Sequence, residues 1–300
     1  MKRIKFHPSF LKFHYFILLF SIFFNTQIYA GEKATLFYNK ESSSVKFAVD
    51  EVSDALKKYN IITLSQSISL VDQLNKKELN FVFLNSNDKE CSKLIQANKI
   101  GRTSELKSEG FLIQRSSPKD KTIWIIGYDE AGLMYGGLEV AEIIKIKGVT
   151  ALQTQLQNPY MSVRGNKFNI PLDMRSPTYT EPSDAAQKNM SEMWDFEFWK
   201  EYIDTLARYR YNLVSLWNMH PFPSMVKVPE YPNVALEDVR KSTGLWKENY
   251  SLNGWGFDAP EIMKSFEIIK KMTIDEKIDF WRKVMAYGKQ RNVNFYIITW

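Results

Sequence analysis

The sequence of 300 residues has room for about two domains. Its hydrophobic share of 44% and its charged share of 25% are those of an ordinary globular protein. The formal net charge of +6 includes four basic residues within the first thirty positions, so the rest of the chain carries +2 and no basic surface that would indicate a nucleic-acid partner.

Residues 1–30 have the three parts of a secretory signal peptide. An apolar core, FILLFSIFF at 16–24, lies between a basic start and a small residue, Ala30, that suits cleavage before Gly31. This core is short for a membrane span, although an uncleaved anchor is the alternative. We therefore expect a secreted or periplasmic protein with no stable membrane insertion after cleavage. The basic start consists of Lys2, Arg3, Lys5 and Lys12.

Cysteine and histidine are scarce. Cys91 is the only cysteine, which excludes an internal disulfide and a cysteine metal cluster. His220 is the only histidine after the predicted signal peptide, so no histidine metal site is expected. The sequence predicts no metal and no cofactor. An exported protein without disulfides fits a bacterial envelope better than a eukaryotic secretory product.

Residues 31–157 alternate between helical and strand patterns. Apolar residues at helical spacing predict a helix over 45–59. Short apolar runs predict strands over 79–84, 111–114 and 122–126, and a second helix is expected over 130–144. This alternation predicts a small α/β sandwich domain.

The segment TIWIIGYDEAGLMYGGLEVAEII at 122–144 carries a spaced motif: Ile126, Gly127, Asp129, Gly132, Tyr135 and Gly136. It resembles the end of the non-catalytic α/β domain that precedes the barrel in family 20 β-N-acetylhexosaminidases and family 67 α-glucuronidases. The glycines would let the start of the helix pack close to the sheet. A phosphate-binding loop is the alternative, but the spacing is not G-x-G-x-x-G.

Residues 158–300 repeat a strand and helix pattern on a larger scale. Strands are predicted over 166–170, 213–217 and 293–300. Helices are predicted over 196–209 and from the N-cap Thr273, with Glu276 at the capping-box position, to Gln290. We interpret this as the first part, about three strands, of a TIM (β/α)₈ barrel. Since such a barrel needs about 250 residues, we expect a truncated catalytic domain. Residues 171–193 and 221–272 are predicted to be long loops.

The first predicted barrel strand supplies three candidate substrate-binding residues. Arg164 precedes Gly165, and this pair resembles the first barrel strand of family 20, which implies that Arg164 holds sugar hydroxyls. Asn169 departs from that family's pattern, in which an acidic residue follows the Arg by five positions. Asp173 and Arg175 lie in the following loop, on the side where barrels carry out chemistry. The alternatives are ion pairs, for Arg164 at the barrel floor and for Asp173 with Arg175 within the loop.

The second and third predicted strands end in further candidates. Trp217, Asn218 and His220 follow the apolar run that begins at Leu213, and Trp300 ends the third strand. The segment from Asn212 resembles the second barrel strand of family 20 and related barrels, which implies polar and aromatic substrate contacts. Core packing for Trp217 and a structural hydrogen bond for His220 remain open.

The resemblance implies a glycoside hydrolase that acts on a carbohydrate substrate, with hexosaminidase-like or α-glucuronidase-like chemistry. The catalytic residues themselves are not identified, because the resemblance places the catalytic acids on later strands, beyond Trp300. One alternative is a non-catalytic carbohydrate-binding envelope protein with a degenerate barrel. Another is an unrelated barrel enzyme such as an isomerase or aldolase.

Overall fold

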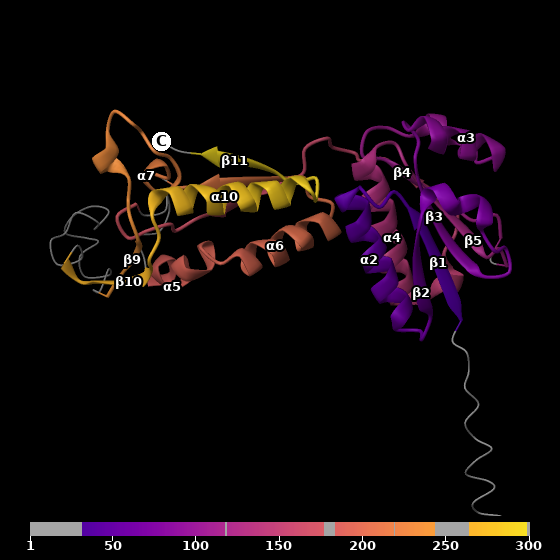
Figure 1. Cartoon of the computed structure of the whole chain (residues 1–300), viewed down its shortest axis with the longest axis horizontal. Coiled ribbons are helices and arrows are strands. Elements are labelled where there is room, and N and C mark those ends of the chain that lie inside the picture. Colours follow the sequence, from indigo (N-terminus) through magenta and orange to yellow (C-terminus); the bar gives the residue numbers. More distant parts are fainter. Residues whose placement is uncertain (1–31, 118, 177–183, 219, 244–263, 299–300) are drawn as a thin grey trace, which may run out of the picture.

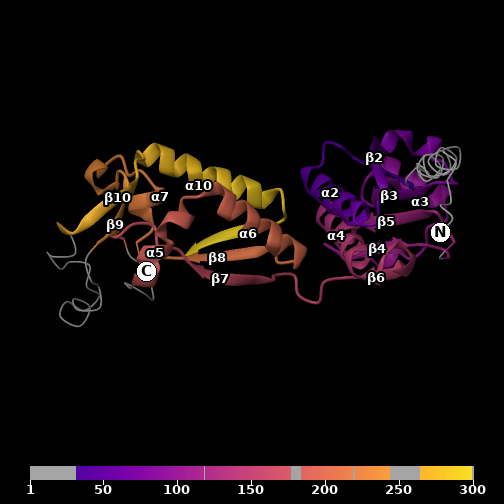
Figure 2. The ribbon, with the colours of Figure 1, turned by 90° about the horizontal axis from the view of Figure 1, so that it is seen from below.

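The computed structural model describes residues 32–117, 119–176, 184–218, 220–243 and 264–298. They form two units that lie end to end, each with its own β-sheet (Figures 1 and 2). The first unit has a six-stranded sheet, and the second has a three-stranded sheet and a separate two-stranded one. The predicted α/β class is confirmed.

The sheet of the first unit has the strand order β2-β1-β3-β5-β4-β6. β2, β1, β3 and β5 are parallel, whereas β4 runs antiparallel to both β5 and β6. The strands are β1 (Lys33–Tyr38), β2 (Ile62–Ser67), β3 (Leu79–Asn85), β4 (Phe111–Gln114), β5 (Thr122–Gly127) and β6 (Gln155–Gln157). The helices are α2 (Ser43–Lys57), α3 (Lys89–Ala97) and α4 (Glu130–Lys147), with short 3₁₀ turns η1 (Ile68–Gln73), η2 (Thr103–Glu105) and η3 (Val149–Ala151).

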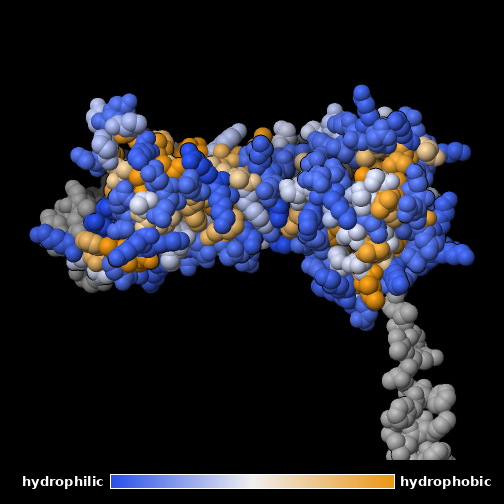
Figure 3. Space-filling view, in the orientation of Figure 1, coloured by the Kyte–Doolittle hydropathy of each residue, from blue (hydrophilic) through white to orange (hydrophobic). Residues whose placement is uncertain are grey.

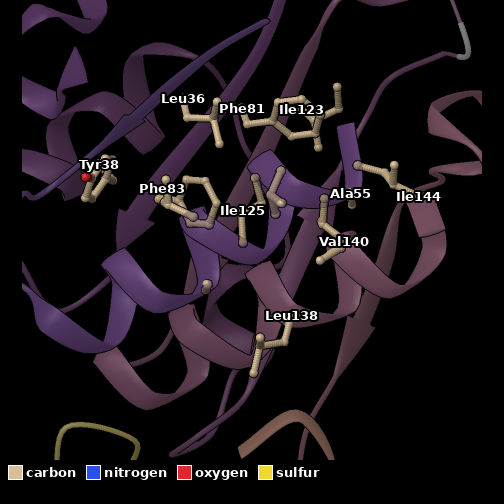
Figure 4. Close-up of a cluster of buried hydrophobic side chains, with 14 of the residues drawn as sticks. Leu36, Tyr38, Ala55, Phe81, Phe83, Ile123, Ile125, Leu138, Val140 and Ile144 are labelled. Atoms are coloured by element: carbon tan, nitrogen blue, oxygen red, sulfur yellow. The ribbon is translucent and has the colours of Figure 1, made fainter. Parts of the chain in front are cut away.

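Helices cover both faces of this sheet. Alternate residues of the central strands, such as Phe81 and Phe83 of β3, point toward α2 and α4 (Figure 4). The residues between them, such as Val82 and Leu84, pack with α3 and η1 on the other face. A central parallel strand that is buried on both faces needs a continuous apolar run, and LNFVFLN supplies one.

The turn from β5 into α4 has the close packing that the glycine motif predicted. Asp129 caps α4 by accepting a hydrogen bond from the backbone N–H of Gly132, at 2.8 Å. A Cβ atom on Gly132 would lie 2.2 Å from the carbonyl oxygen of Gly110, and one on Gly127 would lie 2.1 Å from the backbone nitrogen of Leu133. The motif therefore lets α4 begin against the neighbouring backbone, and the packing interpretation is confirmed.

The second unit has three parallel strands in the order β7-β8-β11, namely β7 (Gly165–Asn169), β8 (Leu213–Trp217) and β11 (Asn294–Ile298). α6 (Phe196–Arg208) and α10 (Ile274–Lys289) connect them and cover one face of the sheet (Figure 2). Phe168, Val214 and Phe295 point toward these helices. α10 begins with the predicted capping box of Thr273 and Glu276.

The two predicted long loops contain secondary structure that the sequence did not reveal. Part of the first loop is α5 (Asp184–Met193). The second holds α7 (Phe222–Met225), η4 (Pro232–Val234) and an antiparallel pair, β9 (Val239–Ser242) and β10 (Phe266–Lys270). The prediction of long loops was wrong there. The pairing of β9 with β10 in particular depends on a contact distant in sequence.

The surface is largely hydrophilic, and hydrophobic residues gather in a stripe over the first unit and around α7 and α10 in the second unit (Figure 3). Phe222 and Val226 are among the exposed apolar residues of that region. None of the helices in the described part of the chain combines the length and the apolar character that crossing a membrane would require.

Candidate functional site

The carboxyl ends of β7, β8 and β11 lie side by side. Asn169 is in register with Trp217, and Trp217 with Ile298. These ends point away from the first unit, whereas the amino ends face it (Figures 1 and 2). In barrels of alternating strands and helices, catalytic and binding groups gather at the carboxyl ends of the strands. We therefore expect a binding or catalytic site at this edge of the sheet.

The face of the sheet opposite the helices is largely polar and aromatic, with Leu213 and Ile298 as aliphatic members. Because side chains alternate along a strand, Lys167, Asn169, Ser215, Trp217 and Tyr296 share this face. The Lys167 ammonium nitrogen lies 4.3 Å from the centroid of the Trp217 ring. The indole N–H of Trp217 donates to the Ser215 hydroxyl at 2.7 Å, which fixes the ring. An oriented indole beside a cation can bind a ligand that has an apolar face and a negative group.

Asp173 and Arg175 form a buried ion pair in the loop after β7. The Arg175 guanidinium donates to both Asp173 carboxylate oxygens, at 2.7 and 2.8 Å, and Asp173 is fully buried. Asp173 also accepts from the backbone N–H of Arg240 at 2.9 Å. Arg175 donates in addition to the carbonyl of Glu237. The pair thus ties this loop to residues 237–240, as the ion-pair alternative predicted.

Asn218 joins the ends of the strands. Its side-chain amide donates to the carbonyls of Ile170 and Ser176, at 2.7 and 3.2 Å, and its backbone N–H donates to the Ile298 carbonyl. Its side-chain oxygen accepts from the backbone N–H of His220 at 2.8 Å, while the His220 side chain is exposed. Asn218 therefore holds together the segments that follow β7, β8 and β11, and the exposed His220 lies next to it.

Lys277 of α10 lies fully buried beneath this loop. Its ammonium group donates to the Leu236 carbonyl at 2.7 Å and to that of Asp238. Burial lowers the pKa of Lys277 to about 8; the Asp173, Glu237 and Asp238 carboxylates oppose this shift, and Arg175 adds to it. Residues 236–238, which accept hydrogen bonds from Arg175, are thus also bound by Lys277, a lysine that loses its proton in mildly alkaline solution.

This pKa predicts a pH-dependent contribution to stability. Between pH 8 and 10.5 the unfolded chain holds more protons at Lys277 than the folded chain does, so the free energy of unfolding gains from this residue as pH rises. Lys277→Met is expected to lack that gain. The difference between wild type and variant should grow by about 1 kcal/mol per pH unit between pH 8.5 and 9.5, measured by urea unfolding. Lys289→Met, at an exposed site on the same helix, should show a constant difference.

Arg164 lies at the opposite end of the sheet from the other described candidates. Its guanidinium pairs with Glu109 of the first unit and donates to the carbonyls of Arg210 and Met161, at 2.7 Å each. The guanidinium carbon also lies 5.8 Å from the centroid of the Tyr135 ring. This arrangement matches the ion pair at the barrel floor that we considered as the alternative for Arg164.

Glu109 joins three segments of the second unit to the first unit. Besides Arg164, it accepts hydrogen bonds from the side-chain amides of Asn212 and Asn292, each at 3.0 Å. The Asn292 amide donates to the Tyr135 hydroxyl as well, at 3.1 Å. Each of the three donors closely precedes a strand of the second unit, so one carboxylate holds the amino ends of β7, β8 and β11.

The structure thus brings together Asp173, Arg175, Trp217, Asn218 and His220 and leaves Arg164 apart. Trp300 lies outside the described residues. Lys167 and Lys277 were missed in the sequence; the alternation of polar and apolar residues in GNKFN could have indicated Lys167. Within the described ranges, no three histidine, cysteine or carboxylate side chains gather as a metal site would require.

Comparisons with known proteins bear on the first unit. Residues 25–139 match the family model described as glycosyl hydrolase family 67 N-terminus. The first unit is a glycoside hydrolase-like N-terminal domain. This domain carries the Glu109 side of the contact just described, so in this chain the family 67-like domain is joined to the amino ends of a parallel sheet. No curated protein matches the chain.

Solved structures support the fold of the two units together. A glycoside hydrolase family 138 enzyme that targets pectin rhamnogalacturonan II is similar, with a TM-score of 0.59 and 17% identity. The match covers 89% of this chain and 31% of that one, so the present chain spans about a third of that enzyme.

Two further glycoside hydrolases match with lower scores. A family 115 4-O-methyl-α-glucuronidase, with specificity for decorated arabinogalactans, has a TM-score of 0.42 and 16% identity; 88% of this chain and 41% of that chain are covered. A family 20 β-N-acetylglucosaminidase has a TM-score of 0.36 and 13% identity, with 69% and 36% covered.

Proposed function

We propose that this chain is part of a glycoside hydrolase that binds its substrate at the carboxyl ends of β7, β8 and β11. The proposal is supported by a glycoside hydrolase-like N-terminal domain joined to a parallel sheet whose far end carries Trp217, Lys167 and Asn218. A pyranose ring has an apolar face that packs on an indole, and its hydroxyls and charged substituents are recognised by polar groups around that ring.

The cation beside Trp217 favours an acidic sugar. For a pyranose bound at the edge of the Trp217 ring, the Lys167 ammonium would be close enough to pair with a uronic acid carboxylate. Among the two chemistries implied by the sequence, this favours the glucuronidase-like one over the hexosaminidase-like one. It also fits the family 138 enzyme, whose target is named a rhamnogalacturonan, that is, a polymer with galacturonic acid units.

The described residues at this edge bind rather than cleave. β7, β8 and β11 contain no aspartate or glutamate. Asp173 is committed to Arg175 and to a backbone N–H. Since glycoside hydrolysis normally uses a pair of carboxyl groups, we place that pair outside these three strands. The leader predicted at residues 1–30 would direct the enzyme out of the cytoplasm.

Lys167→Met tests the proposal in the full-length protein. The variant is expected to raise KM for uronic acid-containing oligosaccharides at least about tenfold, because the lost charged contact contributes about 1.5–3 kcal/mol. Neutral oligosaccharides should be affected much less. Lys283→Met is the matched control, since the Lys283 ammonium also lies over an aromatic ring, 3.8 Å from the centroid of Phe196, but on the helical side. Equal effects of the two variants would contradict the proposal.

A non-catalytic carbohydrate-binding protein is the second candidate. It is favoured by the lack of carboxylates on the three strands, which leaves this part of the chain with binding groups alone. The same assay separates the two. If the full-length protein binds uronic acid-containing oligosaccharides through Lys167 and releases no product from them, the binding function replaces the enzymatic one.

A further inference from the structure

The first unit has a cavity at the carboxyl ends of β1 and β3. Its volume is about 680 Å³, within the range of small-molecule sites. β1 is followed by α2, which covers one face of the sheet, and β3 by α3, which covers the other. The connections therefore leave these two neighbouring strands on opposite faces. In open α/β sheets, ligands bind in the crevice at such a switch point.

The cavity combines an apolar floor with a polar rim. Ile68 and Leu94 supply partly exposed apolar side chains to the lining, next to the almost fully buried Val45, Phe83 and Leu133. Asn39 and Asn85 follow directly on β1 and end β3, so their amides stand at the mouth of the crevice. Ser42 and Ser69 add hydroxyl groups to the lining. A floor of this kind suits a flat apolar surface, while the rim suits hydrogen-bonding groups at its edge.

The charges of the rim select against anions. Four carboxylates line the cavity and face a single ammonium group; they belong to Asp72, Asp88, Glu90 and Glu130, and the ammonium to Lys93. A phosphate or a uronic acid would be repelled by this balance. The cavity thus has the opposite preference to the Lys167 and Trp217 pair.

Asp72 is the carboxylate that remains available for a ligand. Asp88 caps α3 by accepting from two backbone N–H groups, and Glu90 pairs with Lys93. Glu130 accepts from the hydroxyls of Ser42 and Ser44. No hydrogen bond from the described part of the chain reaches the Asp72 carboxylate. A carboxylate in this position can accept hydrogen bonds from two adjacent hydroxyls.

We propose that this cavity binds an uncharged sugar unit, with the apolar face of the pyranose on Ile68 and Leu94 and its hydroxyls on Asp72 and the Asn39 and Asn85 amides. The choice of a sugar rests on the proposed function, but the cavity and its charge do not. The site lies in the N-terminal domain and is separate from the strand ends of the second unit. It would hold the neutral part of a polysaccharide whose acidic part occupies the other site.

Cys91 lines the cavity, so the rate of its alkylation gives a readout of occupancy. Burial raises the pKa of the Cys91 thiol to about 11, so alkylation at pH 9 is slow and is followed over hours. The full-length protein is treated with iodoacetamide at pH 9, and alkylation of the Cys91 peptide is followed by mass spectrometry. Methyl glucoside, methyl galactoside and methyl mannoside are the probes, with sodium galacturonate as the anionic comparison. At least one neutral glycoside is expected to slow alkylation, with a Kd of about 1 mM. Galacturonate should not slow it.

Asp72→Ala should weaken this protection at least about tenfold, since a charged hydrogen-bond acceptor is lost. The matched control is Asp54→Ala, which removes an exposed carboxylate paired with Lys57 on α2 and should leave protection unchanged. The proposal is overturned if none of the neutral glycosides protects Cys91 from alkylation, or if galacturonate protects it equally. It is also overturned if a neutral glycoside protects Cys91 in the Asp72→Ala variant as well as in the wild type. If a neutral glycoside protects Cys91 but the full-length protein hydrolyses no glycoside, the proposed enzymatic function is wrong and the sugar site in the first unit still stands.

Discussion

Replacing Glu109 with alanine is expected to lower the free energy of unfolding by about 3 kcal/mol. The Arg164 guanidinium and the amides of Asn212 and Asn292 would lose the acceptor that they share. The Glu109 and Arg164 side chains are only 16% and 18% exposed, so water replaces the lost partner poorly. Removing one member of a buried pair typically costs about 3–5 kcal/mol. Urea unfolding of the wild type and the variant measures the difference.

A second readout shows whether this loss lies at the contact between the units. The linker at residues 158–164 should become more susceptible to limited proteolysis in Glu109→Ala. Glu105→Ala is the matched control, because Glu105 pairs with Arg102 at a site where both side chains are about half exposed. Its effect on the free energy of unfolding should be much smaller than that of Glu109→Ala. Equal losses for the two variants would mean that Glu109 does not join the units.

Asp173→Asn is expected to cost about 3–5 kcal/mol and to loosen the loop that borders the candidate site. The variant keeps the shape of the side chain but removes the charge that faces the Arg175 guanidinium inside the protein. It also replaces one acceptor oxygen with an N–H₂ group, which cannot accept from Arg175 or from the backbone of Arg240. Urea unfolding measures the loss, and hydrogen exchange of residues 171–176 and 237–240 shows where it occurs.

Asp279→Asn is the control for this prediction. Asp279 also pairs with an arginine close in sequence, Arg282, but these two side chains are 73% and 75% exposed. Such a pair contributes little, so the loss should stay below about 0.5 kcal/mol. If Asp173→Asn lowers the free energy of unfolding as little as Asp279→Asn does, the Asp173–Arg175 pair does not order the loop. The loop would then not support the candidate site.

The elements with strong local signals were predictable from the sequence. The predicted helix over 45–59 is α2 (Ser43–Lys57), and the apolar run LVSLW is β8 at the predicted bounds. The structure confirms the capping box at Thr273. This motif was predictable because both of its hydrogen bonds lie within one turn of helix. These signals depend on spacing within a few residues, which a sequence displays directly.

Elements that depend on distant partners escaped prediction. β2 lies at an edge of its sheet and has the largely polar sequence ITLSQS, so no apolar run marks it. β9 and β10 pair across more than twenty intervening residues. Lys277 is flanked by acidic residues in DEKID, a pattern typical of a solvent-exposed helix face, yet residues 236–238 cover it.

The same limit applied to the candidate site. The position of Trp217, Asn218 and His220 at a strand end followed from the strand pattern. The pairing of Arg164 could not be chosen from the sequence, since Glu109 lies 55 positions away and in another unit. Lys167 and Trp217 meet only because β7 and β8 are neighbours in register, and register is a property of the folded sheet.

The Glu109 contact also bears on the alignment of the carboxyl ends of β7, β8 and β11. The three donors precede strands of equal length, each five residues long. Strands that start at one height and rise equally end at one height, about 17 Å further on. The strand pairing aligns Asn169, Trp217 and Ile298, and the Glu109 carboxylate supports this alignment from the opposite end of the sheet. The first unit would then help to set the geometry of the strand ends at which we propose that a sugar binds.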